Sequence, residues 1–436
     1  MQMYIKMQFS LQPLNFKMKF LLILLQISLI NSYLNSNETR HGIKYTPNNY
    51  KSSNCTKYRR CILNSNINTF GDKIVNIFDK SSRYNNFRHK GRHHEASYIN
   101  RNISKDLDYE ASNYNRNISN GLLISHDAPE FHWDLYKSVY NKVYESARHE
   151  MAALAKWRNN LRRVAEHNKK YLEGKISYSL HLNHFGDLGA TDYFKKILKL
   201  FDTIPLFDPA EDHHRTTYKK VVHRRTPREV DWRAKGFKPR LEEQFKCGAC
   251  YAFAVAHALQ AQVYRKHGDW RELSPQQIVD CSYKDGNMGC NGGSLRAALR
   301  YAAREGLVLE SHYPYKGKKG RCHYIREAPR AKPRRWAMIP AGDEDGMERA
   351  LATIGPLAVA INASPFTFQL YRSGIYDDPF CVPWTLNHAM LLVGYTPEYW
   401  ILLNWWGKQW GENGYMRIRR GFNRCGVANM AAYVEL

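Results

Sequence analysis

The chain has 436 residues, 43% of them hydrophobic, with 29 Tyr and 10 Trp. This composition excludes a wholly disordered or collagen-like protein, and the length predicts two or three folded units, or one enzyme domain behind long leader segments. Lys and Arg number 65 against 40 Asp and Glu, which gives a formal net charge of +25.

Nucleic acid, a membrane surface and an anionic glycan are the partners that such a charge suggests. The basic residues are spread along the chain and no nucleic-acid-binding motif accompanies them, so we expect no nucleic-acid partner. The densest basic stretch, 316–335, holds nine basic residues and one acid. We expect it to be a solvated loop, and a contact with an anionic glycan or an anionic substrate is the alternative.

An apolar run at residues 20–30, FLLILLQISLI, follows Lys17 and Lys19. A transmembrane helix needs about 20 residues, whereas this shorter run fits a signal peptide over residues 1–32, with Met18 as an alternative start and a signal anchor as an alternative reading. Both predict the secretory pathway and a lysosomal or extracellular location. Four sequons for N-glycosylation agree: Asn37, Asn54, Asn102 and Asn117.

Residues 33–126 are rich in Asn and lack apolar periodicity, so we expect a disordered, glycosylated extension. Cys55 and Cys61 within it are close enough in sequence to form a small disulfide loop. The whole chain has nine cysteines. In a secreted protein an odd number of cysteines leaves one thiol without a disulfide partner, and the presence of that free thiol has to be explained.

Aromatic and aliphatic residues recur at helical spacing from residue 131 onward, and Gly174 is a suitable end for such a helix. The segment 201–226 contains prolines and clustered basic residues, which predicts a linker with a processing site. Residues 227–436 then have the composition of one globular domain.

The sequence QFKCGACYAF at 244–253 opens an apolar segment, roughly 250–266, that predicts a buried helix. A C-x-x-C pair suits half a zinc site, but no second ligand pair follows at the right spacing, so no metal is expected. A thioredoxin-type redox pair is a second reading. In the third, Cys250 is a nucleophile at a helix N-terminus, where the peptide dipoles favour the thiolate.

A nucleophilic thiol needs a base and a group that orients the base. The candidates are His388 in LNHAMLLVGY and Asn404 in YWILLNWWGKQWGENGY, each at the edge of a strand-like run.

With these residues in place, the domain from Pro227 resembles the papain family of cysteine proteases, most of all its cathepsin L-like branch. The family's G-C-N-G-G is complete at 289–293, its N-H-A lies at 387–389, and its N-S-W-G-x-x-W-G-x-x-G-Y lies at 404–415 with one mismatch. Its Q-G-x-C-G-S-C-W-A-F element is matched by Gln244, Cys247, Gly248, Cys250, Ala252 and Phe253. The resemblance implies an α+β fold with a helical lobe, a β-barrel-like lobe and a cleft between them.

Residues 127–200 resemble the family's helical inhibitory propeptide. The second half of its E-x3-R-x3-F-x2-N-x3-I-x3-N pattern is matched by Trp157, Asn160, Val164 and Asn168. His149 and Ala153 replace the Glu and Arg of the first half, which puts the helix's internal ion pairing in doubt. The later G-x-N-x-F-x-D element is matched, except for its Gly, by His181, Asn183, Phe185 and Asp187. A zymogen is implied, and we hypothesise that protonation of histidines in 127–225 helps its activation in acid.

The resemblance assigns roles to five residues. The Cys250 thiolate would attack the peptide carbonyl, His388 would protonate the leaving amine, and Asn404 would orient the imidazole. Gln244 would donate a hydrogen bond to the oxyanion, and Trp406 would shield the Asn–His hydrogen bond from water.

Gly293 would pair its backbone with an extended substrate. The main specificity pocket receives the side chain one residue before the acyl residue of the cleaved bond, and by family position it is lined by Leu295, Ala360, Leu386 and Met430. We therefore expect aliphatic or aromatic side chains there, with ordinary core packing of these residues as the alternative. No insertion that would block the cleft is present, which predicts an endopeptidase.

The family's disulfides would be Cys247–Cys290, Cys281–Cys322 and Cys381–Cys425, with Cys55–Cys61 as a fourth, which leaves Cys250 reduced. The expected partners are protein and peptide substrates, the chain's own propeptide and cystatin-like inhibitors. No cofactor is expected, and the protein is expected to be a monomer.

Three bulky residues depart from the family pattern beside reacting groups: Tyr251 replaces Trp, Phe245 replaces Gly and Trp405 replaces Ser. A misplacement of about 1 Å can cost about 100-fold in rate. A catalytically weak or inactive glycoprotein that binds peptides or inhibitors is therefore the alternative function. A disulfide oxidoreductase using Cys247 and Cys250 is a further alternative, but it leaves the other matched motifs unexplained.

Overall fold

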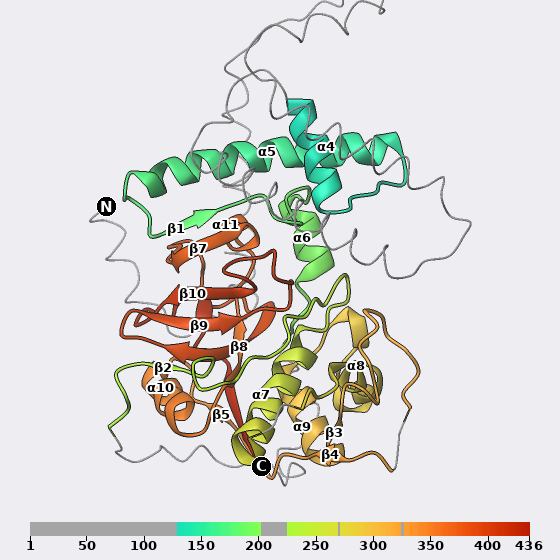
Figure 1. Ribbon diagram of the computed structural model, residues 1–436, viewed down its shortest axis with the longest axis vertical. Coiled ribbons are helices and arrows are strands. Elements are labelled where there is room, and N and C mark those ends of the chain that lie inside the picture. The colour runs from blue at the N-terminus through green and yellow to red at the C-terminus, as the bar shows by residue number, and fades with distance from the viewer. Residues whose placement is uncertain (1–128, 202–224, 269–270, 324–326) are drawn as a thin grey trace, which may run out of the picture. The chain divides into compact units, whose positions relative to one another are not determined.

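A computed structural model describes residues 129–201, 225–268, 271–323 and 327–436 (Figure 1). They all belong to one compact unit, His93–Leu436. The expected signal peptide, the Asn-rich extension with its sequons, the Cys55–Cys61 pair and residues 202–224 of the linker lie outside the described residues. Among the described helices, none is long and apolar enough to cross a membrane.

The segment ahead of the protease domain, called the prosegment below (residues 129–201), contains two helices where the sequence predicted helical structure from 131 to 174. Helix α4 spans Pro129–Val139 and helix α5 spans Ala147–Leu172. Asn141 between them has a φ of +48°, and the Ser146 side chain caps α5 by accepting a hydrogen bond from the backbone N–H of His149. The turn therefore lets α4 fold back onto α5 (Figure 1).

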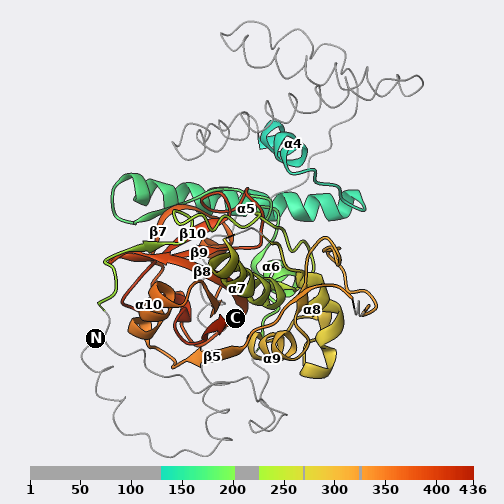
Figure 2. The same ribbon diagram turned by 60° about the horizontal axis from the view of Figure 1, so that its bottom comes forward.

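The prosegment also contributes strand β1 (Tyr178–Leu180) and helix α6 (Ala190–Ile197). β1 pairs antiparallel with β7 (Tyr371–Tyr376) of the protease domain. α5 lies above β1, and β7 and β10 follow beneath it in both views (Figures 1 and 2). The prosegment thus extends the sheet of the protease domain by one strand.

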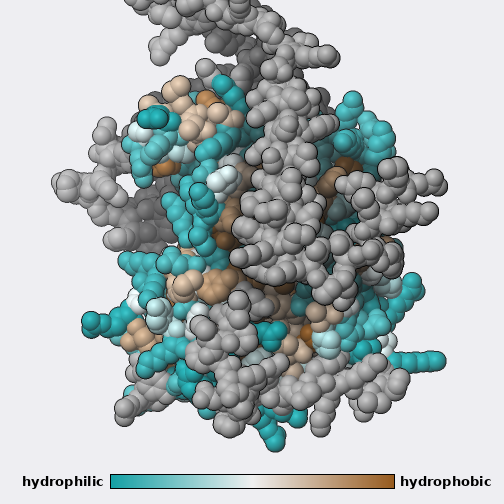
Figure 3. Space-filling view, turned by 180° about the vertical axis from the view of Figure 1, so that it is seen from behind, coloured by the Kyte–Doolittle hydropathy of each residue, from teal (hydrophilic) through white to brown (hydrophobic). Residues whose placement is uncertain are grey.

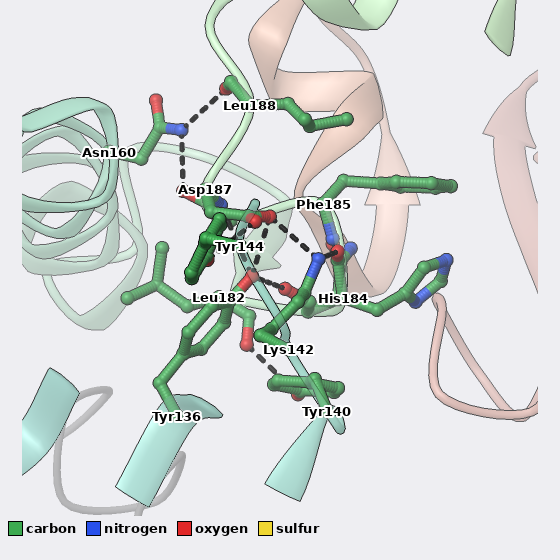
Figure 4. Close-up of polar contacts among 12 residues, drawn as sticks. Tyr136, Tyr140, Lys142, Tyr144, Asn160, Leu182, His184, Phe185, Asp187 and Leu188 are labelled. Atoms are coloured by element: carbon green, nitrogen blue, oxygen red, sulfur yellow. Dashed lines mark hydrogen bonds and ion pairs between the residues drawn. The ribbon is translucent and has the colours of Figure 1, made fainter. Parts of the chain in front are cut away.

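The prosegment lacks the Glu and Arg of the family's helical pattern. Other residues make its polar contacts. Asp187 accepts hydrogen bonds from the hydroxyls of Tyr136 and Tyr144, and the Lys142 Nζ lies 2.8 Å from its Oδ1 (Figure 4). A second ion pair joins Lys156 to Asp192 at 2.5 Å. Ion pairing therefore joins the turn before α5 to the later G-x-N-x-F-x-D element through Asp187, and joins α5 to α6 through Asp192.

The first lobe of the protease domain is helical. Its central helix α7 is buried on almost every side because its sequence is nearly all apolar, and a left-handed Gly268 ends it. The elements of this lobe are α7 (Cys250–His267), α8 (Pro275–Cys281), η2 (Ser282–Asp285), η3 (Gly289–Asn291), α9 (Leu295–Glu305), β3 (Leu307–Val308) and β4 (Arg330–Ala331).

The second lobe is a twisted sheet with strand order β1-β7-β10-β9-β8-β6-β11-β5, in which β2 also pairs with β8. Its remaining strands are β2 (Val230–Asp231), β5 (Arg335–Ile339), β6 (Leu357–Ile361), β8 (His388–Tyr395), β9 (Tyr399–Leu403), β10 (Tyr415–Arg419) and β11 (Ala431–Glu435). Its short helices are α10 (Glu344–Thr353), α11 (Phe366–Gln369) and η4 (Arg424–Gly426).

The two lobes meet along α7, which packs against β8 and β6 on one side and against α9 on the other. Figure 2 shows α7 between the sheet and the other helices of the helical lobe. Seen from behind, hydrophilic and apolar side chains are interspersed on the described surface (Figure 3). This is the two-lobe α+β arrangement that the sequence predicted, and it brings the start of α7 next to the start of β8.

Candidate active site

Cys250 is the first residue of α7 and is fully buried. It is the free cysteine among the described residues, because the other six form disulfides: Cys247–Cys290, Cys281–Cys322 and Cys381–Cys425. These are the three pairs that the resemblance implied. The first of them holds the loop before α7 against the 289–293 turn, so the thiol sits on a fixed support.

His388 and Asn404 are brought together by adjacent strands, since β8 begins at His388 and β9 ends one residue before Asn404. The His388 Nε2 lies 2.7 Å from the Asn404 Oδ1. This oxygen also accepts the backbone N–H of Trp405, so Nε2 must be the donor. The neutral imidazole therefore carries its proton on Nε2, and its buried Nδ1 has no hydrogen-bond partner among the described residues.

Burial favours the neutral forms of the Cys250 thiol and the His388 imidazole in this structure. Burial raises the pKa of the Cys250 thiol to about 12, although backbone hydrogen bonds, including one with Ala389, lower it. Burial lowers the pKa of His388 to about 4, against the opposing effect of its hydrogen bond with Asn404. A site without water favours the uncharged form of each group.

Gln244 lies in the loop before α7, and its backbone N–H donates to the carbonyl of Trp405. Its side-chain Nε2 donates one hydrogen bond, of 3.0 Å, to the carbonyl of Cys247. An amide nitrogen has two hydrogens, so one remains for another acceptor. The side chain is fully buried, which fixes the direction of that second hydrogen.

Trp406 covers the imidazole from the sheet lobe. Its ring stacks on His388 with a centroid separation of 4.6 Å and an interplanar angle of 28°. Two prosegment rings, those of Phe185 and Tyr193, meet Trp406 edge-on at 5.2 Å and 5.8 Å. The prosegment therefore seals the side of the site on which Trp406 lies.

The end of the prosegment runs through the cleft along Gly293. The Gly293 N–H donates to the carbonyl of Lys199, and the N–H of Phe201 donates to the carbonyl of Gly293. The N–H of Leu200 donates to the carbonyl of Asn387, the residue before His388. These bonds form a parallel bridge at Leu200 and occupy the backbone groups to which we assign substrate pairing.

The four predicted pocket residues come from both lobes. The Ala360 N–H donates to the carbonyl of Met430, so these two residues are neighbours on β6 and beside β11. Leu386 lies just before β8, and Leu295 begins α9. Leu295, Ala360 and Met430 are buried, and Leu386 is half-buried.

Two of the three departures from the family pattern are buried and the third is exposed. Tyr251 is buried, and its hydroxyl donates to the carbonyl of Gly289. Trp405 is buried against Phe253, with ring centroids 5.3 Å apart, and its Nε1 donates to the carbonyl of Ala389. Phe245, in contrast, is 56% exposed.

A group of carboxylates beneath the Gln244 loop escaped the sequence analysis. The Tyr315 hydroxyl donates to the carbonyl of Gln244, and its backbone N–H donates to Glu310. Burial raises the pKa of Glu310 to about 7 and that of Glu242 to about 8, and repulsion between the two carboxylates contributes to the second shift. No motif marks these residues, because their contact depends on a loop that returns from residue 315 to residue 244.

Neither a metal nor a redox pair competes for this site in the described part of the chain. No group of three or more His, Cys, Asp or Glu side chains there has the geometry to hold a metal ion. Cys247, the partner that a redox function would require for Cys250, is bonded to Cys290. What the geometry offers is a buried thiol, an oriented imidazole and an amide donor around one cleft.

Comparison with known families agrees with this geometry. Residues 226–435 match the model of the papain family cysteine proteases, and residues 133–193 match that of the cathepsin propeptide inhibitor domain I29. The chain belongs to the papain family of cysteine proteases, and it is a hydrolase made with an inhibitory propeptide.

Individual relatives support the same assignment. Cathepsin S of Bos taurus is 38% identical over 314 residues, which cover 70% of this chain and 93% of that protein. Cathepsin L of Sarcophaga peregrina is 37% identical over 309 residues, covering 69% of this chain and 91% of that protein. Among solved structures, digestive procathepsin L 3 from the Tenebrio molitor larval midgut matches with 31% identity and a TM-score of 0.66, over 71% of this chain and all of that one.

Proposed function

We propose that this protein is the zymogen of a thiol endopeptidase that hydrolyses peptide bonds through Cys250, His388 and Asn404. One observation carries the proposal: the imidazole is held at Nε2 by Asn404, and no described residue hydrogen-bonds to its Nδ1, which can therefore accept a proton. The backbone of Ala389, the residue after His388, contributes to lowering the pKa of the Cys250 thiol, which supports our placing the thiol and the imidazole in one site.

The chemistry follows from these positions. His388 takes the thiol proton on Nδ1, and the Cys250 thiolate attacks the substrate carbonyl carbon. The second Nε2 hydrogen of Gln244 and the backbone N–H of Cys250 stabilise the negative oxygen that forms. The imidazolium then gives its proton to the leaving amine, and water hydrolyses the resulting thioester to restore the enzyme.

The prosegment accounts for the inactive state. It occupies both backbone groups of Gly293, and in its presence the Cys250 thiol and the His388 imidazole are fully buried. Because a low-dielectric site disfavours the thiolate–imidazolium pair, the pKa shifts of the two groups keep the covered site uncharged. Removal of the prosegment admits water and substrate together, so the ion pair forms only in the cleaved enzyme.

Further features of the proposal rest on the sequence and the family. We assign the main specificity pocket to Leu295, Ala360, Leu386 and Met430, with a preference for aliphatic or aromatic side chains. Entry into the secretory pathway through residues 1–32, glycosylation of the extension, inhibition by cystatin-like proteins and a monomeric state belong to the same proposal.

The test is covalent labelling of the acid-activated protein with an epoxide reagent specific for active-site thiols. We expect one label per molecule in the wild-type protein and none in Cys250→Ala, with cleavage of an apolar peptide lost in parallel. The residual rate of Cys250→Ala should be lower by about 10⁶-fold, because removal of a nucleophile disables the whole catalytic unit. Absence of labelling in the wild-type protein would instead identify an inactive peptide-binding protein.

A further inference from the structure

The helical-lobe wall of the cleft carries a group of exposed cations, which we call the basic ridge. Within the described residues, none of its members forms an ion pair with a carboxylate. Most of it belongs to the stretch that the sequence marked as densely basic. Its members are Lys246, Lys284, Lys316, Lys318, Lys319 and Arg321.

The centre of the ridge, residues 316–321, is held rigidly on α8. Gln276 of α8 accepts a hydrogen bond from the N–H of Lys316 and donates one to the carbonyl of Lys318. Asp280, also on α8, accepts the N–H of Gly320 at 2.7 Å. The Cys281–Cys322 disulfide fixes the end of the loop. These bonds fix the backbone and leave the cationic side chains in solvent, so the charges remain available to a ligand.

The ridge borders the cleft at two points. A Cβ built on Gly317 would lie 2.9 Å from the ring of Phe245, which follows Gln244 and precedes Lys246. A Cβ built on Gly289 would lie 2.7 Å from the side chain of Lys319, and Gly289 begins the turn that ends at Gly293. Lys319 also lies over the ring of Tyr283, next to Lys284. The cations therefore follow the cleft wall from the oxyanion loop to the turn that pairs with an extended chain.

The prosegment shows which side chains of an extended chain face this wall. Leu198 and Leu200 are buried, whereas the side chain of Lys199 between them lies against Gly248 of the helical lobe. Successive side chains of an extended chain point to opposite sides. Three sheet-lobe residues help to line the apolar pocket. When the substrate residue that precedes the acyl residue enters this pocket, the substrate residues on either side of it face the helical-lobe wall.

We propose that the basic ridge selects substrates with acidic side chains on both sides of the residue that enters the apolar pocket. This inference rests on the proposed endopeptidase function and names a substrate class for that site. The favoured sequence is acidic–apolar–acidic, cleaved after the second acidic residue. The side chain of Lys199 lies against Gly248 of the same wall, and a carboxylate at this place in a substrate would be attracted by the cations of the ridge.

The test uses the acid-activated protein and two quenched fluorescent peptides that differ only in having Glu or Gln at the two flanking positions. We expect about a 5-fold higher kcat/KM for the Glu peptide at low ionic strength, a magnitude typical of two exposed ion pairs. The preference should disappear at about 0.5 M salt, because the screening length then falls to a few ångströms. The triple variant Lys316→Gln, Lys318→Gln, Lys319→Gln should lose the preference. It should cleave both peptides at the rate at which the wild-type protein cleaves the Gln peptide.

The matched control removes three exposed cations elsewhere, in Lys266→Gln, Lys332→Gln, Arg334→Gln. We expect it to keep the preference for Glu, and an equal loss in both variants would show that net charge, not the ridge, is responsible. Equal rates for both peptides in the wild-type protein contradict the ridge proposal while leaving the proposed function intact. No cleavage of either peptide contradicts the proposed function. If the triple variant loses only retention on a heparin column, the ridge binds polyanionic glycans instead, and the proposal is wrong.

Discussion

Phe245 occupies a backbone conformation that its side chain disfavours. Its φ is +53°, in the left-handed region, at a position where the family pattern has Gly. A side chain in this region costs about 1–2 kcal/mol, because its Cβ crowds the following carbonyl oxygen. The ring lies mostly in solvent and contacts Gly317, so the side chain has room. The cost is a strained backbone at the residue next to Gln244.

We predict that Phe245→Gly is more stable than Phe245→Ala by about 1 kcal/mol. Both substitutions remove the ring and its contact with Gly317, so their difference isolates the backbone strain. Chemical denaturation of the two variants, followed by intrinsic fluorescence, measures this difference. Equal stability would mean that the loop relaxes when the ring is removed and that the left-handed conformation carries no strain.

The other two departures, Tyr251 and Trp405, are fully buried side chains of the protease domain. Tyr251 points into the helical lobe and hydrogen-bonds to Gly289, where its ring approaches Gly293 so closely that a Cβ there would lie 2.7 Å away. Trp405 fills the space between α7 and β8 and stacks on Phe253. Tyr251 is smaller than the Trp it replaces, whereas Trp405 adds volume that is buried in the core. The His388 Nε2 still lies 2.7 Å from the Asn404 Oδ1.

At the scale of elements, the turn between β1 and α6 carries buried histidines. The ring nitrogens of His184 are both buried without a partner among the described residues, and burial, with Lys142 and His181 nearby, lowers its pKa from 6.5 to about 3. The Nε2–H of His181 donates to the carbonyl of Gln409, and burial, with Arg372 nearby, lowers the pKa of His181 to about 4. These two residues lie within the described prosegment, whereas His213, His214 and His223 of the linker lie outside it.

The sign of the pH effect follows from these shifts. A base whose pKa is lower in the docked state binds fewer protons there than when the prosegment is released. Docking is therefore unaffected above pH 6.5 and weakens as the pH falls from 6.5 toward 3 for His184 and toward 4 for His181. At about pH 4.5, His184 alone would weaken docking by about 100-fold relative to neutral pH.

We predict that His184→Phe lowers the pH of half-maximal autoprocessing by about 0.5–1 unit. Phenylalanine keeps a ring against Phe185, which lies 3.9 Å from the imidazole by ring centroids, and cannot be protonated. Gel analysis of processing across pH 3.5–7 measures the shift. The control is His149→Gln, an exposed prosegment histidine, which should leave the profile unchanged. An unaltered profile in His184→Phe would assign the pH response to other groups.

At the scale of the whole molecule, the prosegment and the protease domain share one core. Phe185 and Tyr193 pack on Trp406, β1 joins the sheet at β7, and the chain then continues through the cleft to Gly293. His388, which we propose as catalytic, stacks on the same Trp406 ring against which the prosegment aromatics pack. Loss of one aromatic contact should open the site before any cleavage occurs.

We predict that Phe185→Ala increases epoxide labelling of uncleaved zymogen at neutral pH by about 10-fold or more, since truncation of a buried Phe costs about 3 kcal/mol of docking energy. The control is Phe194→Ala on α6, because that ring is 48% exposed and should contribute little to docking. The rate of labelling, measured by mass before processing begins, gives the readout. Similar labelling in both variants would show that the Trp406 contact does not govern closure.

The sequence anticipated several particular elements well. The predicted helix at 250–266 corresponds to α7 at Cys250–His267. The prediction succeeded because a segment that is apolar on nearly all sides is typical of a buried helix. The helical stretch from residue 131 was interrupted by the turn at Asn141, which apolar spacing does not reveal. The carboxylates Glu242 and Glu310 had no signal at all, because they meet through loops far apart in the sequence.

The sequence by itself determined the family, the two-lobe fold and the presence of a propeptide, because motifs of fixed order and spacing encode local turns, helix starts and strand ends. Only the tertiary structure decided which protons the site holds, where the three bulky departures point and which cations line the cleft. The unpaired thiol illustrates the division: an odd number of cysteines requires it, but its neutral state depends on its burial in the folded chain. Burial and electrostatics arise from the packing of distant segments, and no local pattern contains them.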